Sequence, residues 1–180
     1  MNRKGYLKFI LVISLFLVSV FCSEQVLSIN TAPENNKQSS DYWAKLADQW
    51  VGLSPGKETS SAQFNRKAHP SLWSLPSVKA NMIKTLGSER FMLVTKRWSM
   101  LSSIDRVENY MLFTAQKSKD GGRHRADIYI STRDGSVQAC WHDEDVMNDN
   151  DIWIRSGEKL KKLSKGGCES DSVINELNIK

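Results

Sequence analysis

The chain has 180 residues with 25 Lys and Arg against 20 Asp and Glu, which gives a formal net charge of +5 at pH 7. This length fits one domain of ordinary size, whose core needs no metal ion to fold. Part of the positive charge lies in the first residues, so we expect no nucleic-acid partner.

The N-terminus has the pattern of an export signal. Arg3, Lys4 and Lys8 precede the apolar stretch Phe9–Phe21, which only two serines interrupt. A charged segment followed by an apolar one is typical of a secretory signal. The apolar stretch is shorter than the roughly 20 residues that a transmembrane helix needs, and no second such stretch follows. We therefore expect an exported protein that works outside the cytoplasm and has no membrane span after signal removal.

Small residues precede two cleavage positions, after Cys22 and after Ser28, and we favour Ser28. Alternatively Cys22 is the lipid-bearing cysteine of a lipoprotein, although bulky Phe21 precedes it. Cleavage after Ser28 removes three basic residues and one acidic residue, which leaves 152 of the 180 residues and lowers the net charge from +5 to +3. The expected organisation is a signal peptide at 1–28, a flexible arm at 29–40 and a single domain at 41–180.

Helical spacing of apolar residues follows the polar arm. It predicts a helix over Asp41–Trp50, with Ser40 or Asp41 as its N-cap. The next stretch, to Ser74, is largely polar and is expected to be a loop with a helical turn at Ala62–Lys67. Two further helices are predicted at 76–86 and 88–98, and Gly87 joins them.

After Trp98 the apolar spacing becomes that of strands. The predicted strands are 103–107, 109–116, 125–132, 136–141 and 151–155. The Asp-Gly turn at Arg133–Ser136 makes the third and fourth strands a hairpin. Alternation within 125–132 predicts a sheet with one buried face, and the C-terminus is expected to be a polar tail. The fold class is therefore α+β, with N-terminal helices packed on an antiparallel meander of about five strands.

Two cysteines remain after signal removal, Cys140 and Cys168. We expect them to form a disulfide, because disulfides persist outside the cytoplasm. The bond would stabilise the fold by roughly 3.5 kcal/mol through its effect on the unfolded chain. The alternative is two separate buried thiols.

Enzyme chemistry finds little support in the sequence. The histidines His69, His124 and His142 share no ligand spacing, and each alone is typical of a surface residue. Zinc-protease, nucleophile-elbow and phosphate-loop motifs are absent. We expect a protein that is not an enzyme and has no cofactor.

The segment His142–Asp151 is dense in oxygen ligands of the type that calcium takes. Its spacing does not match an EF-hand, so we interpret it as a solvated loop between two strands and expect no metal there.

A basic segment, Lys117–Arg125, lies between two predicted strands and carries four positive charges with two adjacent glycines. Such a loop either docks into a carboxylate-lined cleft of a partner or is a solvated hairpin loop kept soluble by its charges.

The segment from Tyr110 to Gly122 resembles the bacterial inhibitors of vertebrate lysozyme, exported α+β proteins that plug a lysozyme cleft. In that family a strand opening with tyrosine leads to a Cys-Lys-Pro-His-Asp-Cys-Gly loop. Here Tyr110–Ala115 leads to Gln116–Gly122, in which Lys117, Asp120 and Gly122 coincide with the family loop. The resemblance covers roughly Leu75 to Trp153.

The loop also departs from the family. Gln116 and Gly121 replace the two cysteines, and Lys119 replaces the histidine that family members place against lysozyme carboxylates. The loop is therefore expected to be less pre-organised, and Lys119 would act as a mobile point charge.

The resemblance implies a periplasmic protein that inhibits a lysozyme-like cell-wall hydrolase by inserting a loop into its cleft. The implied partner-binding residues are Lys117, Lys119, Asp120, Gly121, Gly122, Arg123 and His124. The alternatives are an immunity protein that neutralises a toxin delivered into the periplasm and a non-enzymatic envelope protein. A homodimer is left open.

Overall fold

The computed structural model describes residues 39–57, 68–147, 150–163 and 166–169, with Val173, Glu176 and Leu177. These residues belong to one compact unit, Lys37–Lys180. The export signal, both cleavage positions, residues 29–38 of the arm and the turn at 62–67 lie outside the described residues. Within them, no helix is both long enough and apolar enough to cross a membrane.

The first helix, α2 (Ser40–Trp50), confirms the predicted one and buries the apolar side chains that lie at helical spacing. Its N-cap is Ser39, so the expected cap at Ser40 or Asp41 was wrong. The Ser39 side chain makes no capping hydrogen bond. The backbone N–H of Tyr42 donates to the Ser39 carbonyl instead, which starts the helix one residue earlier.

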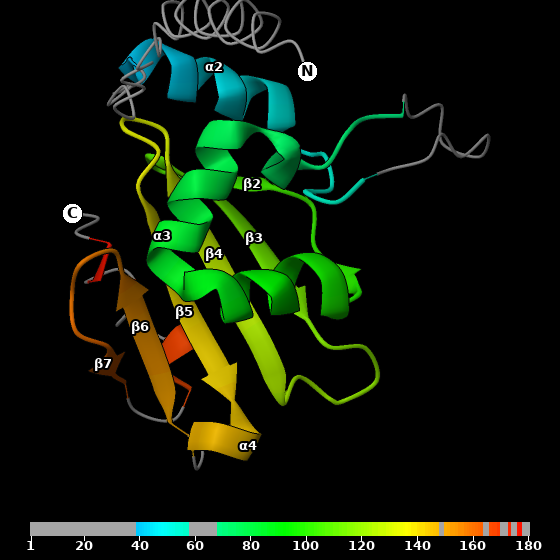
Figure 1. Ribbon diagram of the computed structural model, residues 1–180, viewed down its shortest axis with the longest axis vertical. Helices are drawn as coiled ribbons and strands as arrows, with labels where there is room; N and C mark the ends of the chain where they lie inside the picture. Colours follow the sequence, from blue (N-terminus) through cyan, green and yellow to red (C-terminus); the bar gives the residue numbers. More distant parts are fainter. Residues whose placement is uncertain are drawn as a thin grey trace, which may run out of the picture. The chain divides into compact units, whose positions relative to one another are not determined.

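The two helical segments predicted around Gly87 are confirmed. Helix α3 (Pro76–Met92) is interrupted at Gly87, whose φ of 78° and ψ of 162° are not helical. A short 3-10 turn, η1 (Leu72–Ser74), precedes α3, and a π-helical turn, η2 (Leu93–Arg97), follows it. Figure 1 shows α3 lying across the strands, with its two segments running in different directions.

The described residues contain one seven-stranded antiparallel sheet in the order β1-β3-β4-β5-β6-β7, with β2 also paired to β3. Its strands are β1 (Met100–Leu101), β2 (Asp105–Val107), β3 (Tyr110–Gln116), β4 (His124–Ser131), β5 (Val137–Asp143), β6 (Asp151–Arg155) and β7 (Lys161–Lys162). The expected five strands are β2 to β6. The additional β1 and β7 have two residues each, too few to give an alternating pattern.

One face of the sheet packs against the helices. Phe113, Ile128, Ala139 and Ile154 are successive Cα partners across β3 to β6, and all are buried. They share one core with apolar side chains of α2 and α3. The protein therefore has the α+β fold predicted from the sequence, in which the helices come first in the chain and the sheet follows.

The other face is also covered, so the expectation of a single buried face was wrong. Tyr129 is only 5% exposed, and it packs with Cys140 and Trp153 of the neighbouring strands. Leu163, Val173 and Leu177 from the C-terminal segment complete this second cluster. The expected polar tail is thus partly buried, because three widely spaced apolar side chains leave no periodic signal in the sequence.

Candidate functional site

A row of polar side chains crosses the second face of the sheet at one end. Gln116 lies opposite Arg125, Arg125 opposite His142, and His142 opposite Asp151. Directly paired residues in an antiparallel sheet project from the same face. The four side chains therefore line one strip of the face that lies away from the helices.

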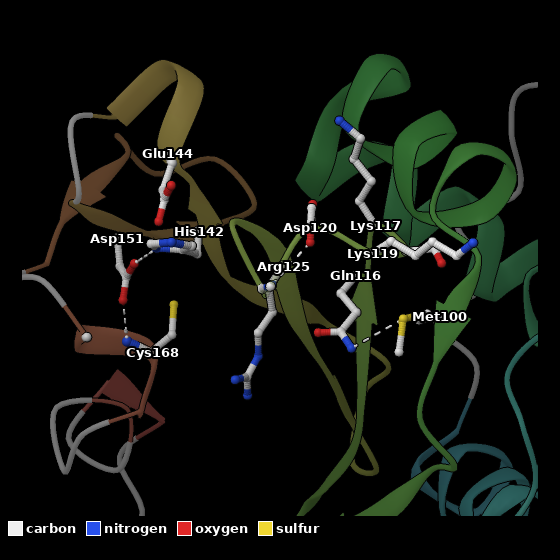
Figure 2. A pocket seen from close by; sticks show the side chains of 14 residues that line it. Met100, Gln116, Lys117, Lys119, Asp120, Arg125, His142, Glu144, Asp151 and Cys168 are labelled. Atoms are coloured by element: carbon white, nitrogen blue, oxygen red, sulfur yellow. Dashed lines mark hydrogen bonds and ion pairs between the residues drawn. The ribbon is translucent and has the colours of Figure 1, made fainter.

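This row forms the floor of a hollow of about 790 Å³, called the first hollow below. One side is lined by the β3–β4 loop (Lys117–Arg123), and the opposite side by Gly166 and Cys168. Figure 2 shows Arg125 between the two sides, with His142 and Asp151 on one side and Lys117 and Lys119 on the other.

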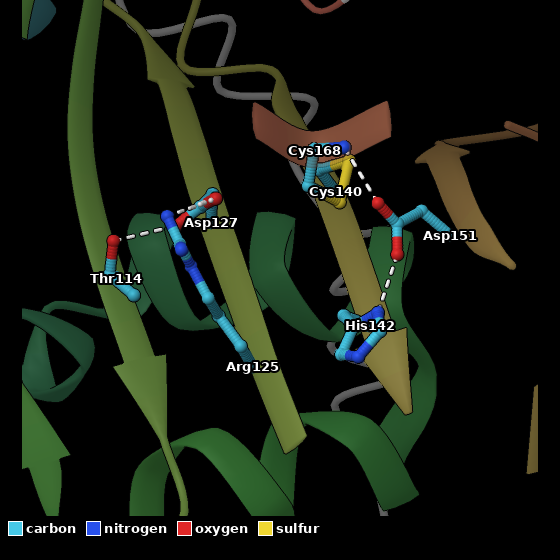
Figure 3. Close-up of a disulfide and its surroundings, with 7 residues drawn as sticks. All are labelled: Thr114, Arg125, Asp127, Cys140, His142, Asp151 and Cys168. Carbon is cyan, nitrogen blue, oxygen red and sulfur yellow. Dashed lines mark hydrogen bonds and ion pairs between the residues drawn. A yellow bond between two sulfur atoms is a disulfide. The ribbon is translucent and has the colours of Figure 1, made fainter. Parts of the chain in front are cut away.

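The predicted disulfide between Cys140 and Cys168 is confirmed, with a Cα–Cα distance of 5.5 Å. It fastens the C-terminal segment to β5, beside the first hollow (Figure 3). The backbone N–H of Cys168 also donates to Oδ2 of Asp151 at 2.7 Å. The disulfide and this hydrogen bond together hold one side of the first hollow in place.

Two of the floor residues are paired with buried carboxylates. Arg125 donates from Nε and Nη2 to the two oxygens of Asp127, at 3.2 and 3.0 Å. His142 donates from Nδ1 to Asp151 Oδ1 at 2.6 Å, and Asp151 is 1% exposed (Figure 3). With Nδ1 engaged in this way, Nε2 of His142 is the ring nitrogen that a ligand could contact.

The β3–β4 loop is closed by Asp120. Its Oδ1 accepts a hydrogen bond from the N–H of Gly122 at 3.1 Å, and its Oδ2 accepts one from Nδ1 of His124 at 2.8 Å. Burial raises the pKa of Asp120, but the hydrogen bonds from His124 and Gly122 outweigh this effect and hold the pKa below its usual value. These two contacts of Asp120 constrain the loop in the absence of the family's cysteines.

His124 is buried, contrary to the expectation that each histidine lies at the surface. Its Nε2 lies 2.9 Å from Oδ2 of Asp145 and 3.6 Å from Oδ1 of Asp143. With Asp120 at Nδ1, the ring therefore faces three carboxylates. Sequence spacing did not show this cluster, because only the pairing of β4 with β5 brings His124 opposite Asp143.

The acidic segment is not the solvated loop that we expected. Asp143 ends β5, Glu144 begins the short helix α4 (Glu144–Met147), and Asp151 begins β6. Arg123 donates to Glu144 Oε2 at 2.6 Å and to Asp145 Oδ1 at 3.2 Å. The hydrogen bond to Glu144 and the charges of both carboxylates raise the pKa of Arg123. Asn148 and Asp149 lie outside the described residues.

Of the four expected loop charges, two are paired inside the molecule, because Arg123 and Arg125 form the salt bridges described above. Lys117 and Lys119 are exposed, and neither forms a salt bridge within the described part of the chain. Gly121 is also exposed, whereas Gly122 is partly buried. The free positive charge of the loop is therefore concentrated at Lys117 and Lys119.

Sequence reasoning missed the polar row on the floor of the first hollow. A signal for one of its pairs was present, since the turn at Arg133–Ser136 fixes the register that places Arg125 opposite His142. We found no match to this chain among protein-family models, curated proteins or solved structures. What the molecule does is therefore inferred from the first hollow, the β3–β4 loop and their charges.

Proposed function

We propose that this chain is a periplasmic binding protein that inhibits a lysozyme-like cell-wall hydrolase by placing the β3–β4 loop in the active-site cleft of that enzyme. The observation that carries the proposal is the pair of exposed ammonium groups of Lys117 and Lys119, which lack a salt bridge within the described residues. Glycan-cleaving hydrolases place two carboxyl groups on either side of the scissile bond. Two cations on one loop are a fitting complement to such a cleft.

The internal anchoring of the loop supports this role. Asp120 bonds to Gly122 within the loop and to His124 at the start of β4, and Arg123 fastens the loop to Glu144. A binding segment that is already ordered loses less conformational entropy when it meets its partner. The contacts of Asp120 thus offer the pre-organisation that the family loop is expected to gain from its cysteines.

The first hollow enlarges the surface that a partner can contact. It lies directly beside Lys117 and Lys119, and Arg125 and His142 form its floor. When this chain inserts the tip of the loop into the cleft of a hydrolase, the rim of that cleft faces this concave surface. The disulfide at its edge is compatible with export, because such bonds persist outside the cytoplasm.

The proposal is tested by measuring inhibition of a panel of lysozymes and periplasmic hydrolases by the exported, purified protein. Lys119→Ala should weaken inhibition of the target by about 2 kcal/mol, or roughly 30-fold, if its charge pair is buried in the complex. Lys84→Ala is the matched control, because Lys84 is an exposed lysine on α3, away from the loop. Its inhibition constant should equal that of the unmodified protein.

Inhibition that is unchanged in both Lys117→Ala and Lys119→Ala would reject the role of the loop. The panel also contains toxins that act in the periplasm, since the immunity-protein alternative requires the same kind of contact surface. Tight binding to a toxin with no effect on any hydrolase would reject the hydrolase as the partner. Mass spectrometry of the exported protein tests the location and shows whether the chain begins after Ser28.

A further inference from the structure

The two cysteines of the disulfide differ in their access to solvent. Cys140 lies on β5 and is fully buried. Cys168 belongs to the 3-10 turn η3 (Gly167–Glu169), is partly exposed and lines the first hollow. A thiol in solution therefore reaches the disulfide most readily from the first hollow, where it meets the sulfur of Cys168.

The carboxylate of Asp151 lies close to both sulfur atoms. One of its oxygens and the two Sγ atoms all lie within 4.8 Å of one another. Asp151 is 1% exposed, and its two oxygens accept hydrogen bonds from the N–H of Cys168 and from Nδ1 of His142 (Figure 3). Hydrogen bonds accepted at both oxygens favour the ionised form of a carboxyl group. A negative charge is therefore held beside the disulfide.

The same residue connects the disulfide to the floor of the first hollow. Asp151 holds η3 through the N–H of Cys168, and it holds the ring of His142 through Nδ1. Figure 2 shows both hydrogen bonds on one side of the first hollow. Once the disulfide is broken, no covalent bond ties η3 to β5, so the contact between Cys168 and Asp151 is weakened. The state of the disulfide therefore affects the position of His142.

We propose that the disulfide is a redox-sensitive switch of the first hollow, which a dithiol opens by attacking Cys168 and which the charge of Asp151 protects from anionic thiols. The switch goes beyond the proposed inhibition, because it concerns the reactivity of the disulfide itself. Its use as a regulator rests on the proposed function, in which the first hollow is part of the surface that contacts a hydrolase.

The reaction is an ordinary thiol–disulfide exchange in two steps. A thiolate of the dithiol forms a bond to Sγ of Cys168 while the bond between Cys168 and Cys140 breaks. Cys140 leaves with the electron pair and takes a proton from the solvent. The second thiol of the reagent loses its proton, attacks the reagent sulfur that is bonded to Cys168 and releases Cys168, which is protonated in turn. The protein gains two electrons and two protons, and the dithiol becomes a disulfide.

The charge of Asp151 opposes the first step in two ways. It repels the incoming thiolate, and it disfavours the negative charge that forms on buried Cys140 as this residue leaves. A further charge on the reagent, about 8 Å from the carboxylate, changes the rate by a factor of about 2.4 even at the dielectric constant of water. Exchanging an ammonium group for a sulfonate on the reagent therefore changes the rate by about 6-fold.

The first test measures reduction of the full exported chain by two small thiols at low ionic strength, where charges are least screened. Cysteamine carries an ammonium group, and 2-mercaptoethanesulfonate carries a sulfonate. Asp151→Asn and Asp151→Ser should each lower the preference for cysteamine by about 6-fold. Asp105→Asn, which changes an exposed carboxylate on β2, is the matched control and should keep the preference of the unmodified chain.

The ratio of the two rates separates charge from structure. A variant that merely loosens the fold is reduced faster by both thiols alike, so its ratio does not change. The other charges that line the first hollow, such as Lys119 and Glu144, are the same in both proteins and cancel in the comparison. Each variant is first checked for cooperative thermal unfolding.

Two further measurements use the unmodified chain. Mass spectrometry after brief treatment with glutathione should find the mixed disulfide on Cys168. In the reduced, folded chain the NMR signal of the His142 ring should shift, whereas that of His69, which packs against Trp50, should not.

Glutathione found on Cys140 would overturn the proposal, as would reduction no faster than global unfolding, because Cys168 would then not be reached from the first hollow. An unchanged thiol preference in the folded Asp151 variants, or an unchanged His142 signal after reduction, would do the same. None of these readouts uses a hydrolase, so failure of the switch is distinguishable from failure of the proposed function.

Discussion

Asp120 lies 2.8 Å from His124 and closes the β3–β4 loop through side chains that are four residues apart in the chain. Their side chains are only 12% and 11% exposed, although Asp120 belongs to a highly charged loop and His124 follows that loop directly. The β3–β4 loop therefore has two kinds of residue. Asp120 and His124 hold its base through internal contacts, while Lys117 and Lys119 remain exposed.

Asp120→Asn should destabilise the fold by about 1.5–3 kcal/mol near pH 5, because the hydrogen bond between the ionised carboxylate of Asp120 and His124 is lost. The pKa of Asp120 is lower in the folded than in the unfolded chain, so its contribution is present above the unfolded value of 3.8. That contribution is lost as the pH falls from 3.8 through the folded pKa. Urea unfolding of both proteins between pH 5 and pH 2.5 should show the difference in stability shrinking. A pH-independent difference would contradict this assignment.

The disulfide should stabilise the fold by roughly 3.5 kcal/mol, so the double change Cys140→Ala with Cys168→Ala should lower the free energy of unfolding by about that amount. The loss of protection from hydrogen exchange should begin near the former disulfide. The N–H groups of Leu163 and Cys168, which donate to Asp151, should lose hydrogen-exchange protection before β4 does. Equal protection of these groups in the two proteins would show that packing alone holds the C-terminal segment.

Gly135 occupies the hairpin turn at a place where no side chain fits. A Cβ there would lie 2.0 Å from Trp43 of α2, and the φ of Gly135 is +70°. Gly135→Ala should therefore cost about 1–2 kcal/mol for the left-handed backbone and about 1–3 kcal/mol for the clash. Gly157→Ala is the control, with a φ of +79° and no atom within 4 Å of the added Cβ, so it carries only the first cost. Equal melting temperatures for the two variants would show that Trp43 moves aside freely.

Asp151 connects three parts of the molecule. It begins β6, accepts from His142 of β5 and accepts from the backbone of Cys168. Asp151→Ala should cost about 2–3 kcal/mol, because it leaves buried donors without acceptors. Asp48→Ala breaks only the exposed pair with Arg106 and should cost less than about 1 kcal/mol. Similar urea midpoints for both variants would mean that water replaces the Asp151 carboxylate.

Local patterns in the sequence determined most of the fold. The spacing of apolar residues predicted α2, the helices around Gly87 and the strands β2 to β6, since each side chain lies on a face set by its own few neighbours. The Asp-Gly turn predicted the hairpin of β4 and β5. Cys140 and Cys168 were paired correctly because only two cysteines remain after the expected signal.

The candidate sites depended on tertiary structure. His124, Asp143 and Asp145 meet because β4 pairs with β5 and α4 then turns the chain back, a contact between residues about 20 positions apart. Likewise, Leu163 and Leu177 cover the second face without any periodic signal. Periodicity reports which side of its own element a residue occupies, whereas burial and charge pairing depend on which distant segment packs there. The sequence by itself therefore determined α2, the helices around Gly87, the strands β2 to β6 and the disulfide. Only the packed sheet decided which loop charges are paired and which stay exposed.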